Sequence, residues 1–267
     1  PPGRRRGTRV TSTSPAQVFA VITAAGSGTR LGSDRPKALV DLDGMPLVEH
    51  ALRNLHSGGV DCAVVTAPPD RFDEFQALLD TAEFRDIVRV VPGSPLSRQA
   101  SVAAGLEALA TTAGTLNDDS PVLIHDAARP LVSPQLVSRV IAALRAGEQA
   151  VIPGLAVADT LKSFREVPEA SAGQAQGARY VEATVDRAAL VAVQTPQGFP
   201  WKVIRELHRC AAASANSEAT ALTDDAGLAQ QAGIPVRIVA GEGRALKITT
   251  PIDLVFARAI LAQDARA

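Results

Sequence analysis

The 267 residues are 46% hydrophobic and carry a formal net charge of −1, a composition typical of a soluble globular protein with a sizeable core. Without a basic excess, a scaffold that holds nucleic acid through unspecific phosphate contacts is excluded, and we expect no nucleic-acid partner. Cys62 and Cys210 are the two cysteines, too few for a disulfide framework or a Cys-x-x-Cys metal site. No apolar run approaches the roughly 18 residues that span a bilayer. We therefore expect a cytoplasmic protein with no membrane contact.

Residues 1–17 contain Arg4-Arg5-Arg6 and Thr11-Ser12-Thr13-Ser14 but lack the apolar centre of a signal peptide. We predict a disordered tail over these residues. The remaining residues, 18–267, show neither an internal repeat nor a boundary and are predicted to form a single domain.

The first ordered stretch runs from Val18 to Arg30 and changes from apolar and β-branched residues to a loop of small ones. It predicts a buried strand that delivers its carboxyl end to a ligand. Gly26 and Gly28 allow positive φ, so that successive N–H groups can turn toward an anion. Arg30 and Lys37 add two positive charges, and a polyphosphate is the anion that suits this combination.

Two familiar phosphate motifs do not fit this loop. A P-loop places Lys-Ser/Thr directly after its last glycine, whereas Gly28 is followed by Thr29-Arg30. The dinucleotide fingerprint requires a third glycine at the position that Leu31 occupies. From the residues alone, an ordinary glycine-rich turn between a strand and a helix remains an alternative.

Downstream, apolar periodicity and turn residues alternate between strands and helices. Strands are predicted over 38–42, 63–67, 87–91, 122–126, 150–153, 191–194, 236–240 and 245–248. Helices are predicted over 46–56, 70–79, 97–110, 133–146, after Pro200, over 224–232 with Thr223 as N-cap, and after Thr250 with a buried stripe of Ile252, Val255, Phe256, Ala259 and Ile260. This alternation predicts a doubly wound α/β fold with a mostly parallel sheet, in which ligands bind beyond the carboxyl ends of the strands.

Residues 157–187 depart from this pattern. Alternating segments flank a polar Gly/Ala/Gln stretch over 168–177, which predicts a two-stranded β-arm with a flexible tip. Because an isolated hairpin is only marginally stable in water, the arm is expected to pack on something, most simply on a second subunit.

Polar residues follow the strand predicted to end at Asp126. In His125-Asp126-Ala127-Ala128-Arg129-Pro130, the acid could hold a metal or substrate hydroxyls and Arg129 could bind an anion. A loop-stabilising Asp–Arg pair is the alternative, and His125 is expected to support the loop. Lys247 and Arg187 could point into the cleft or to solvent, and the turns Thr195-Pro196-Gln197 and Thr223-Asp224-Asp225 could simply cap helices.

In order, Ala24–Arg30 with Pro36-Lys37, His125–Pro130, Asp159-Thr160, Thr184-Val185-Asp186-Arg187, Gln194–Gln197, Thr223–Asp225 and Lys247-Ile248-Thr249-Thr250 resemble the 2-C-methyl-D-erythritol 4-phosphate cytidylyltransferases. The resemblance runs from about Val18 to the carboxyl terminus. Its opening loop is shared by many nucleotidyltransferases, whereas the Thr-Val-Asp-Arg and Lys-Ile-Thr-Thr segments are far more specific.

The resemblance implies transfer of CMP from CTP to 2-C-methyl-D-erythritol 4-phosphate, with release of pyrophosphate, in the non-mevalonate isoprenoid precursor pathway. It implies a Mg²⁺ ion held mainly through the CTP phosphates, and a homodimer in which the arm carries Thr160 and Arg187 to the partner's site. The catalytic residues it implies are Arg30 and Lys37 on the CTP phosphates, and Arg187 and Lys247 on the sugar phosphate. The substrate-binding residues it implies are Ala24, Ala25, Gly26, Gly28, Gly93, Ser101, Asp126, Arg129, Thr160, Thr195 and Thr223.

The segment Gly93-Ser94-Pro95-Leu96-Ser97-Arg98 departs from the family pattern, which has a compact Gly-Gly-x-x-Arg turn against the cytosine ring. Here the turn is one residue longer and has an extra proline. Two alternatives stay open: a cytidylyltransferase for ribitol 5-phosphate, and a nucleotide-binding regulator without catalysis. Thr184–Arg187 and the Ala127-Ala128 pair favour methylerythritol phosphate, and the cations at 30, 37, 187 and 247 weigh against the regulator.

Overall fold

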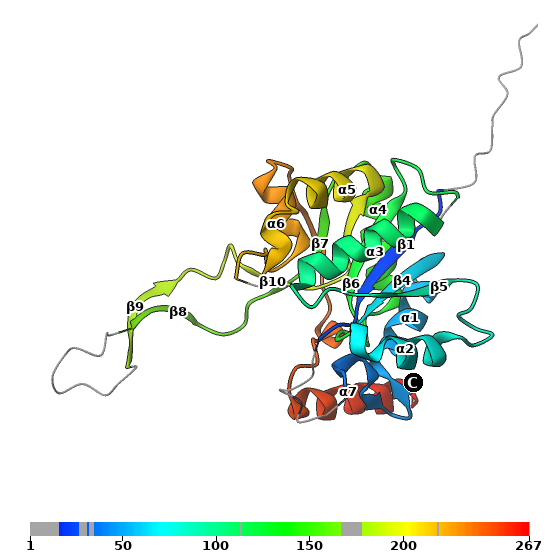
Figure 1. Ribbon diagram of the computed structural model, residues 1–267. Coiled ribbons are helices and arrows are strands. Elements are labelled where there is room, and N and C mark those ends of the chain that lie inside the picture. The colour runs from blue at the N-terminus through cyan, green and yellow to red at the C-terminus, as the bar shows by residue number, and fades with distance from the viewer. Residues whose placement is uncertain are drawn as a thin grey trace, which may run out of the picture.

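The computed structural model describes residues 16–26, 31, 35–112, 114–166, 178–217 and 219–266. Their centre is a twisted sheet with helices on both faces (Figure 1). In spatial order its strands are β10 (Val191–Val193), β7 (Val151–Ala156), β11 (Gln197–Pro200), β6 (Pro121–Asp126), β1 (Phe19–Thr23), β4 (Cys62–Ala67) and β5 (Val88–Pro92), with β12 (Arg237–Ala240) beside β7.

Strands β6, β1, β4 and β5 run parallel, and β11 and β10 run antiparallel to their neighbours. Thr23 at the end of β1 is in register with Asp126 on β6 and Thr66 on β4. The mostly parallel sheet is therefore confirmed, and its register brings the loops after β1 and β6 to one edge. The antiparallel strand β11 was not predicted, because Gln197–Pro200 contains a glycine and a proline and lacks an apolar run.

The side chains of β1 alternate between two apolar clusters. Ala20 and Ile22 belong to the cluster shared with α1 (Leu47–Ser57), α2 (Phe72–Leu79) and α4 (Pro134–Arg145). Phe19 and Val21 belong to the cluster shared with α3 (Arg98–Thr112), α5 (Trp201–Cys210) and α6 (Asp225–Gln231). Since successive strand residues face opposite sides, both faces of the sheet are covered, and the predicted doubly wound fold is confirmed.

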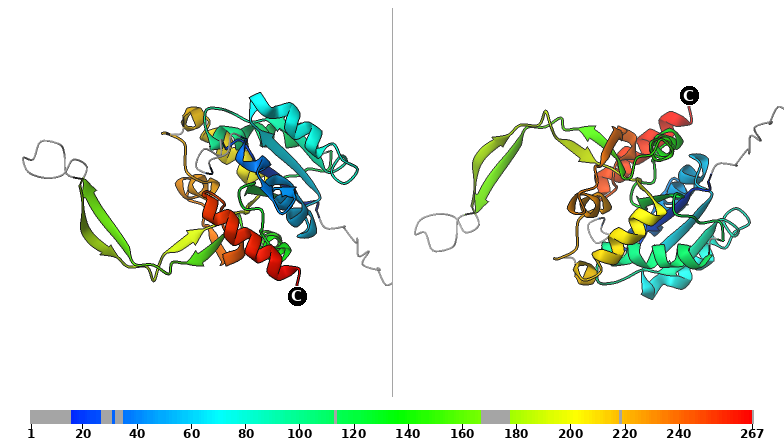
Figure 2. Two further views of the ribbon diagram at one scale, coloured as in Figure 1. Left: turned by 90° about the horizontal axis from the view of Figure 1, so that it is seen from below. Right: turned by 90° about the horizontal axis from the view of Figure 1, so that it is seen from above.

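Two antiparallel strands, β8 (Leu161–Glu166) and β9 (Arg179–Val185), form an arm that stands away from the sheet and its helices (Figures 1 and 2). Almost every residue of the two strands is exposed. The predicted flexible tip at 168–177 lies outside the described residues, as does most of the predicted amino-terminal tail.

Two predicted strands are wrong. Residues 38–42 contain the 3₁₀ turn η2 (Lys37–Leu39) and the short β2 (Asp41–Leu42), which pairs with β3 (Met45–Pro46). The turn between β2 and β3 is Asp43-Gly44, where both residues have positive φ. Residues 245–248 follow the 3₁₀ turn η5 (Gly243–Ala245) in an extended loop without a strand partner among the described residues, because the Ile248 amide donates instead to the Ala128 carbonyl. Further short turns are η3 (Pro69–Arg71) and η4 (Ser214–Asn216).

The last helix, α7 (Pro251–Asp264), begins as predicted with a capping box between Thr250 and Asp253. Its predicted buried stripe is wrong at four of five positions: Ile252, Val255 and Phe256 are more than half exposed, and Ala259 is exposed as well. Ile260 packs as predicted, together with Leu254, Ala257 and Leu261. Apolar residues lie on several sides of α7, so periodicity did not identify the packed face. The predicted N-cap of α6 is also wrong by one residue, since the Asp224 carboxylate, and not Thr223, accepts from the Gly227 amide.

Candidate active site

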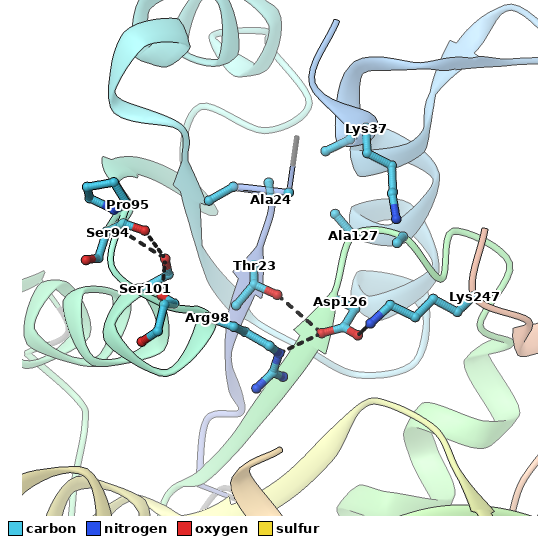
Figure 3. Close-up of a pocket in the computed structure, with 15 residues that line it drawn as sticks. Thr23, Ala24, Lys37, Ser94, Pro95, Arg98, Ser101, Asp126, Ala127 and Lys247 are labelled. Carbon is cyan, nitrogen blue, oxygen red and sulfur yellow. Dashed lines mark hydrogen bonds and ion pairs between the residues drawn. The ribbon is translucent and has the colours of Figure 1, made fainter. Parts of the chain in front are cut away.

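A cavity of about 310 Å³ opens at the edge where β1 and β6 end. In Figure 3, Lys37 and Lys247 lie on one side of it, across from Ser94 and Pro95, with Asp126 and Arg98 below. The described lining residues are Thr23, Ala24, Ala25, Gly26, Lys37, Ala38, Ser94, Pro95, Ser97, Arg98, Ser101, Asp126, Ala127, Ala128 and Lys247. Segments more than a hundred residues apart in the sequence thus meet at one site.

The two ends of the predicted phosphate loop are held together. The Lys37 amide donates to the Gly26 carbonyl at 3.2 Å, and the Ala24 amide donates to the Thr66 carbonyl at 3.0 Å. Lys37 therefore lies beside Ala24, Ala25 and Gly26 in the cavity wall. Gly28 and Arg30 lie outside the described residues.

The Asp126 side chain is bonded through both of its carboxylate oxygens. Its Oδ1 accepts from Arg98 Nε at 3.1 Å and from the Thr23 hydroxyl at 3.3 Å, and its Oδ2 accepts from Lys247 Nζ at 2.8 Å (Figure 3). Burial alone would raise the pKa of the Asp126 carboxyl. Arg98 and Lys247 outweigh burial and hold that pKa well below its usual range. Asp126 is therefore a carboxylate at any physiological pH.

His125, which is fully buried, supports the loop as predicted. Its Nε2 lies 3.2 Å from the Arg129 carbonyl and its Nδ1 lies 3.0 Å from the Thr195 hydroxyl. Because a carbonyl can only accept, Nε2 carries the proton and Nδ1 accepts from Thr195. The Thr195 hydroxyl in turn accepts from the Asp126 amide at 3.1 Å. These hydrogen bonds fix the backbone of Asp126 and leave Thr195 buried beneath the cavity floor.

Arg129 lies outside the described cavity lining. Its Nη1 donates to the Ala245 carbonyl at 2.8 Å and its Nη2 to the Val193 carbonyl at 3.2 Å. Burial lowers the pKa of its guanidinium. Arg129 thereby ties the loop after β6 to the segment that leads to Lys247, in place of the Asp–Arg pair weighed from the sequence.

The turn after β5 forms the opposite wall. The Gly93 amide donates to the Ala67 carbonyl at 2.7 Å, and a Cβ at Gly93 would lie 3.2 Å from that same oxygen. The buried Ser101 hydroxyl accepts from the Ser94 amide at 3.0 Å and lies within hydrogen-bond distance of the Ser94 and Ser97 carbonyls. Gly93 and Ser101 are thus brought to the site and shape a turn whose wall includes Ser94 and Pro95.

Three predicted residues are exposed and lie outside the cavity lining of this chain: Thr160 and Arg187 at the base of the arm, and Thr223 before α6. The Arg187 guanidinium donates to the Ala158 carbonyl. The structure therefore does not bring these three residues together with Lys37 and Lys247 within the described part of one chain.

The structure adds cavity residues that the sequence did not single out. Thr23 ends β1 within hydrogen-bond distance of Asp126, and Arg98 begins α3 with its guanidinium directed to the same carboxylate. Arg98 lines the cavity with its side chain 22% exposed. The resemblance of the 93–98 turn to a Gly-Gly-x-x-Arg motif was the available signal for Arg98.

The donor set suits a cation held mainly by a ligand. Within the described residues no cluster of three or more His, Cys, Asp or Glu side chains could hold a metal ion, and Asp126 is the carboxylate in the described lining. Mg²⁺ commonly binds through one or two carboxylates plus substrate phosphates. The residues present therefore fit a Mg²⁺ ion carried by a polyphosphate, with Asp126 as the nearby carboxylate.

Comparison with known proteins assigns this geometry to a family. The family model "IspD: 2-C-methyl-D-erythritol 4-phosphate cytidylyltransferase" matches residues 18–263. A protein of that name from Streptomyces coelicolor is 44% identical over 254 residues, covering 94% of this chain and 87% of its own length. Another from Nocardia farcinica is 44% identical, covering 91% and 94%.

Solved structures agree with the sequence comparison. A crystal structure of 2-C-methyl-D-erythritol 4-phosphate cytidylyltransferase from Thermus thermophilus matches with a TM-score of 0.68 and 35% identity, covering 92% of this chain and 99% of its own. A 4-diphosphocytidyl-2C-methyl-D-erythritol synthase from Anaerococcus prevotii matches with a TM-score of 0.70 and 30% identity, covering 92% and 98%.

Within the described residues, no helix is both long and apolar enough to cross a membrane.

Proposed function

The chain belongs to the 2-C-methyl-D-erythritol 4-phosphate cytidylyltransferase family, and on that premise we propose that it transfers CMP from CTP to 2-C-methyl-D-erythritol 4-phosphate. The products are 4-diphosphocytidyl-2-C-methyl-D-erythritol and pyrophosphate, in the non-mevalonate isoprenoid precursor pathway. One observation carries the proposal: Lys37, Arg98 and Lys247 line one cavity with Asp126 as the facing carboxylate. This excess of positive charge suits two phosphorylated substrates.

In the proposed reaction, a phosphate oxygen of the sugar phosphate attacks the α-phosphorus of CTP. A new P–O bond forms there, and the bond from the α-phosphorus to the bridging oxygen breaks, so that pyrophosphate leaves with the electron pair. Because the attacking phosphate is already ionised near neutral pH, no general base is needed. Catalysis then depends on positioning and on stabilisation of the charge that develops on the phosphates.

The roles of the side chains follow from their places. Lys37, beside the glycine loop, is assigned with Arg30 to the CTP phosphates, and Lys247 is assigned to the sugar phosphate. A bound Mg²⁺ ion would neutralise phosphate charge, with Asp126 as the carboxylate nearby. The backbone at Ala24, Ala25, Gly26 and Gly93, together with the turn that Ser101 holds, is assigned to cytidine.

The proposed enzyme is a homodimer, formed through the arm. On β8 and β9, Phe164 and its cross-strand partner Val181 are 49% and 64% exposed, and an apolar surface of this kind usually meets a partner. We assign Thr160 and Arg187, at the base of the arm, to the site of the neighbouring subunit. Asp126, Arg129, Thr195 and Thr223 are assigned to the sugar-phosphate side, Arg129 and Thr195 through the loop they hold.

The test is a pyrophosphate-release assay with CTP and Mg²⁺, run in parallel with 2-C-methyl-D-erythritol 4-phosphate and ribitol 5-phosphate. We expect turnover with the first sugar phosphate. Lys37→Ala is expected to lower kcat by about a thousandfold, the order seen when a transition-state charge donor is removed. Lys202→Ala, on the exposed side of α5, is the control and should keep wild-type turnover. CTP binding without turnover would contradict the proposal, and near-normal turnover of Lys37→Ala would refute the role of Lys37.

A further inference from the structure

Arg98 lies between two carboxylates that belong to different parts of the fold. Its Nε donates to Asp126 Oδ1 at 3.1 Å, and its Nη1 donates to Asp225 Oδ2 at 2.8 Å. Asp126 ends β6 in the cavity floor, whereas Asp225 begins α6. A guanidinium can span the two acceptors because its donors are fixed in a planar fork, and the single ammonium of a lysine cannot reproduce that geometry.

Asp225 is itself oriented by a second hydrogen bond, from a histidine. It is 1% exposed, and its Oδ1 lies 2.9 Å from Nε2 of His208 on α5, which is 6% exposed. Since a carboxylate only accepts, Nε2 of His208 carries the proton of this bond. Burial would raise the pKa of Asp225, but Arg98 and His208 outweigh it and lower that pKa. Asp225 is therefore an ionised partner of Arg98, and each of its two carboxylate oxygens is held by a hydrogen bond.

The neighbours of Arg98 attach the same turn of α3 to the segment before α6. The Ser97 hydroxyl donates to the Ala215 carbonyl at 2.7 Å. The Gln99 amide group donates to the Ala211 carbonyl at 3.1 Å and its oxygen accepts from the Leu222 amide at 3.1 Å. The start of α3 is thus bonded to Ala211, Ala215 and Leu222, the last of which precedes Thr223. Ser101, one turn later, holds the backbone of Ser94 and Ser97 in the wall of the cavity.

We propose that Arg98 is a positioning residue for the transfer reaction: by bridging Asp126 and Asp225, it fixes the segment that carries Thr223 relative to the floor on which the nucleotide reacts. The proposal rests on the proposed function, because it assigns Thr223 to the sugar-phosphate side. Arg98 acts through Asp126 and Asp225 and transfers no proton. Loss of the bridge should therefore misplace the sugar phosphate more than it weakens CTP binding.

The test compares steady-state kinetics of Arg98→Lys and Asp225→Asn with those of Arg139→Lys. Arg98→Lys keeps the charge but satisfies one carboxylate, and Asp225→Asn removes the charged acceptor at the α6 end of the bridge while the bond from Arg98 to Asp126 remains. Both should lower kcat/KM for the sugar phosphate by about tenfold or more, since a misplacement of about 1 Å can cost a hundredfold. The KM for CTP should change by less than about threefold, because neither substitution removes a group assigned to binding CTP. Arg139→Lys is the matched control, because it makes the same exchange in an ion pair with Glu242, at 2.7 Å, that lies outside the described cavity lining.

Thermal unfolding of each variant separates stability from positioning. The inference is supported when Arg98→Lys and Asp225→Asn share the kinetic split and the double variant is no worse than either single one. It is overturned when Arg98→Lys behaves as Arg139→Lys does, or when both KM values rise together. If Arg98→Lys does not fold, Asp225→Asn decides by the same criteria. A wild-type protein without turnover would overturn the proposed function and this inference together, whereas an absent split in an active protein overturns this inference alone.

Discussion

Replacing His125 by asparagine should remove a measurable part of the acid sensitivity of the fold. Burial is the largest effect on His125 and lowers its pKa from 6.5 to about 4. Below pH 6.5 the unfolded chain binds a proton that the folded chain refuses, so stability falls with pH until about pH 4. A difference of 2.5 pKa units corresponds to about 3 kcal/mol of unfolding free energy lost across this window.

Urea denaturation at fixed protein concentration, repeated between pH 7 and pH 4.5, measures this loss. His125→Asn cannot titrate and retains an acceptor for the Thr195 hydroxyl, so its stability should be lower at pH 7 but should fall less steeply with pH. Val140→Ala, a buried truncation on α4, controls for lost stability and should keep the wild-type slope. Equal slopes in wild-type protein and His125→Asn would refute the assignment of acid sensitivity to His125.

Two further substitutions test the packing of α3 and the role of the arm. Gly105→Ala should destabilise the protein by about 1–3 kcal/mol in urea denaturation, because the new Cβ would lie 2.4 Å from Val21 Cγ1. Gly243→Ala, with nothing within 4 Å of its Cβ, should be near neutral, and equal stability of the two variants would contradict the packing argument. Val181→Asp should convert the proposed dimer to monomer in sedimentation velocity without loss of secondary structure. Glu182→Gln, on the next residue of β9, should stay dimeric, and a dimeric Val181→Asp would remove Val181 from the interface.

The central strands and helices could be predicted because their apolar patterns are set locally. The run Val122–Ile124 is buried on both sides, and such a run has one good solution in a parallel sheet. Residues 245–248 have a similar composition but no neighbouring strand in the described sheet, so the loop satisfies its amides elsewhere. The packed face of α7 could not be predicted for a related reason. Which apolar residues this helix buries depends on the cluster around Leu42, Leu47 and Leu131, and only the tertiary fold assembles that cluster.

Part of the candidate site could likewise be predicted from the sequence, and part of it could not. Gly26 and Lys37 could be predicted as lining residues because a strand, a glycine loop and a cation lie close together in sequence, and the family resemblance added Ala24 and Ala25. Arg98 could not, because its partners Asp126 and Asp225 are 28 and 127 residues away. The spacing of such charges has no period that a sequence pattern could show. The bridge that Arg98 makes between Asp126 and Asp225 is seen only in the folded structure.

The two cations on Asp126 differ in what they can do when an anion arrives. The Lys247 side chain is 42% exposed, whereas that of Arg98 is 22% exposed and is bonded to Asp225 as well. A phosphate that enters the cavity therefore competes for Lys247 far more easily than for Arg98. In the proposed reaction Lys247 would turn to the substrate while Arg98 stays in place, so Asp126 would remain ionised and oriented. On that proposal the Arg98–Asp225 pair preserves the cavity floor, and the more exposed lysine on Asp126 supplies the charge that responds to the ligand.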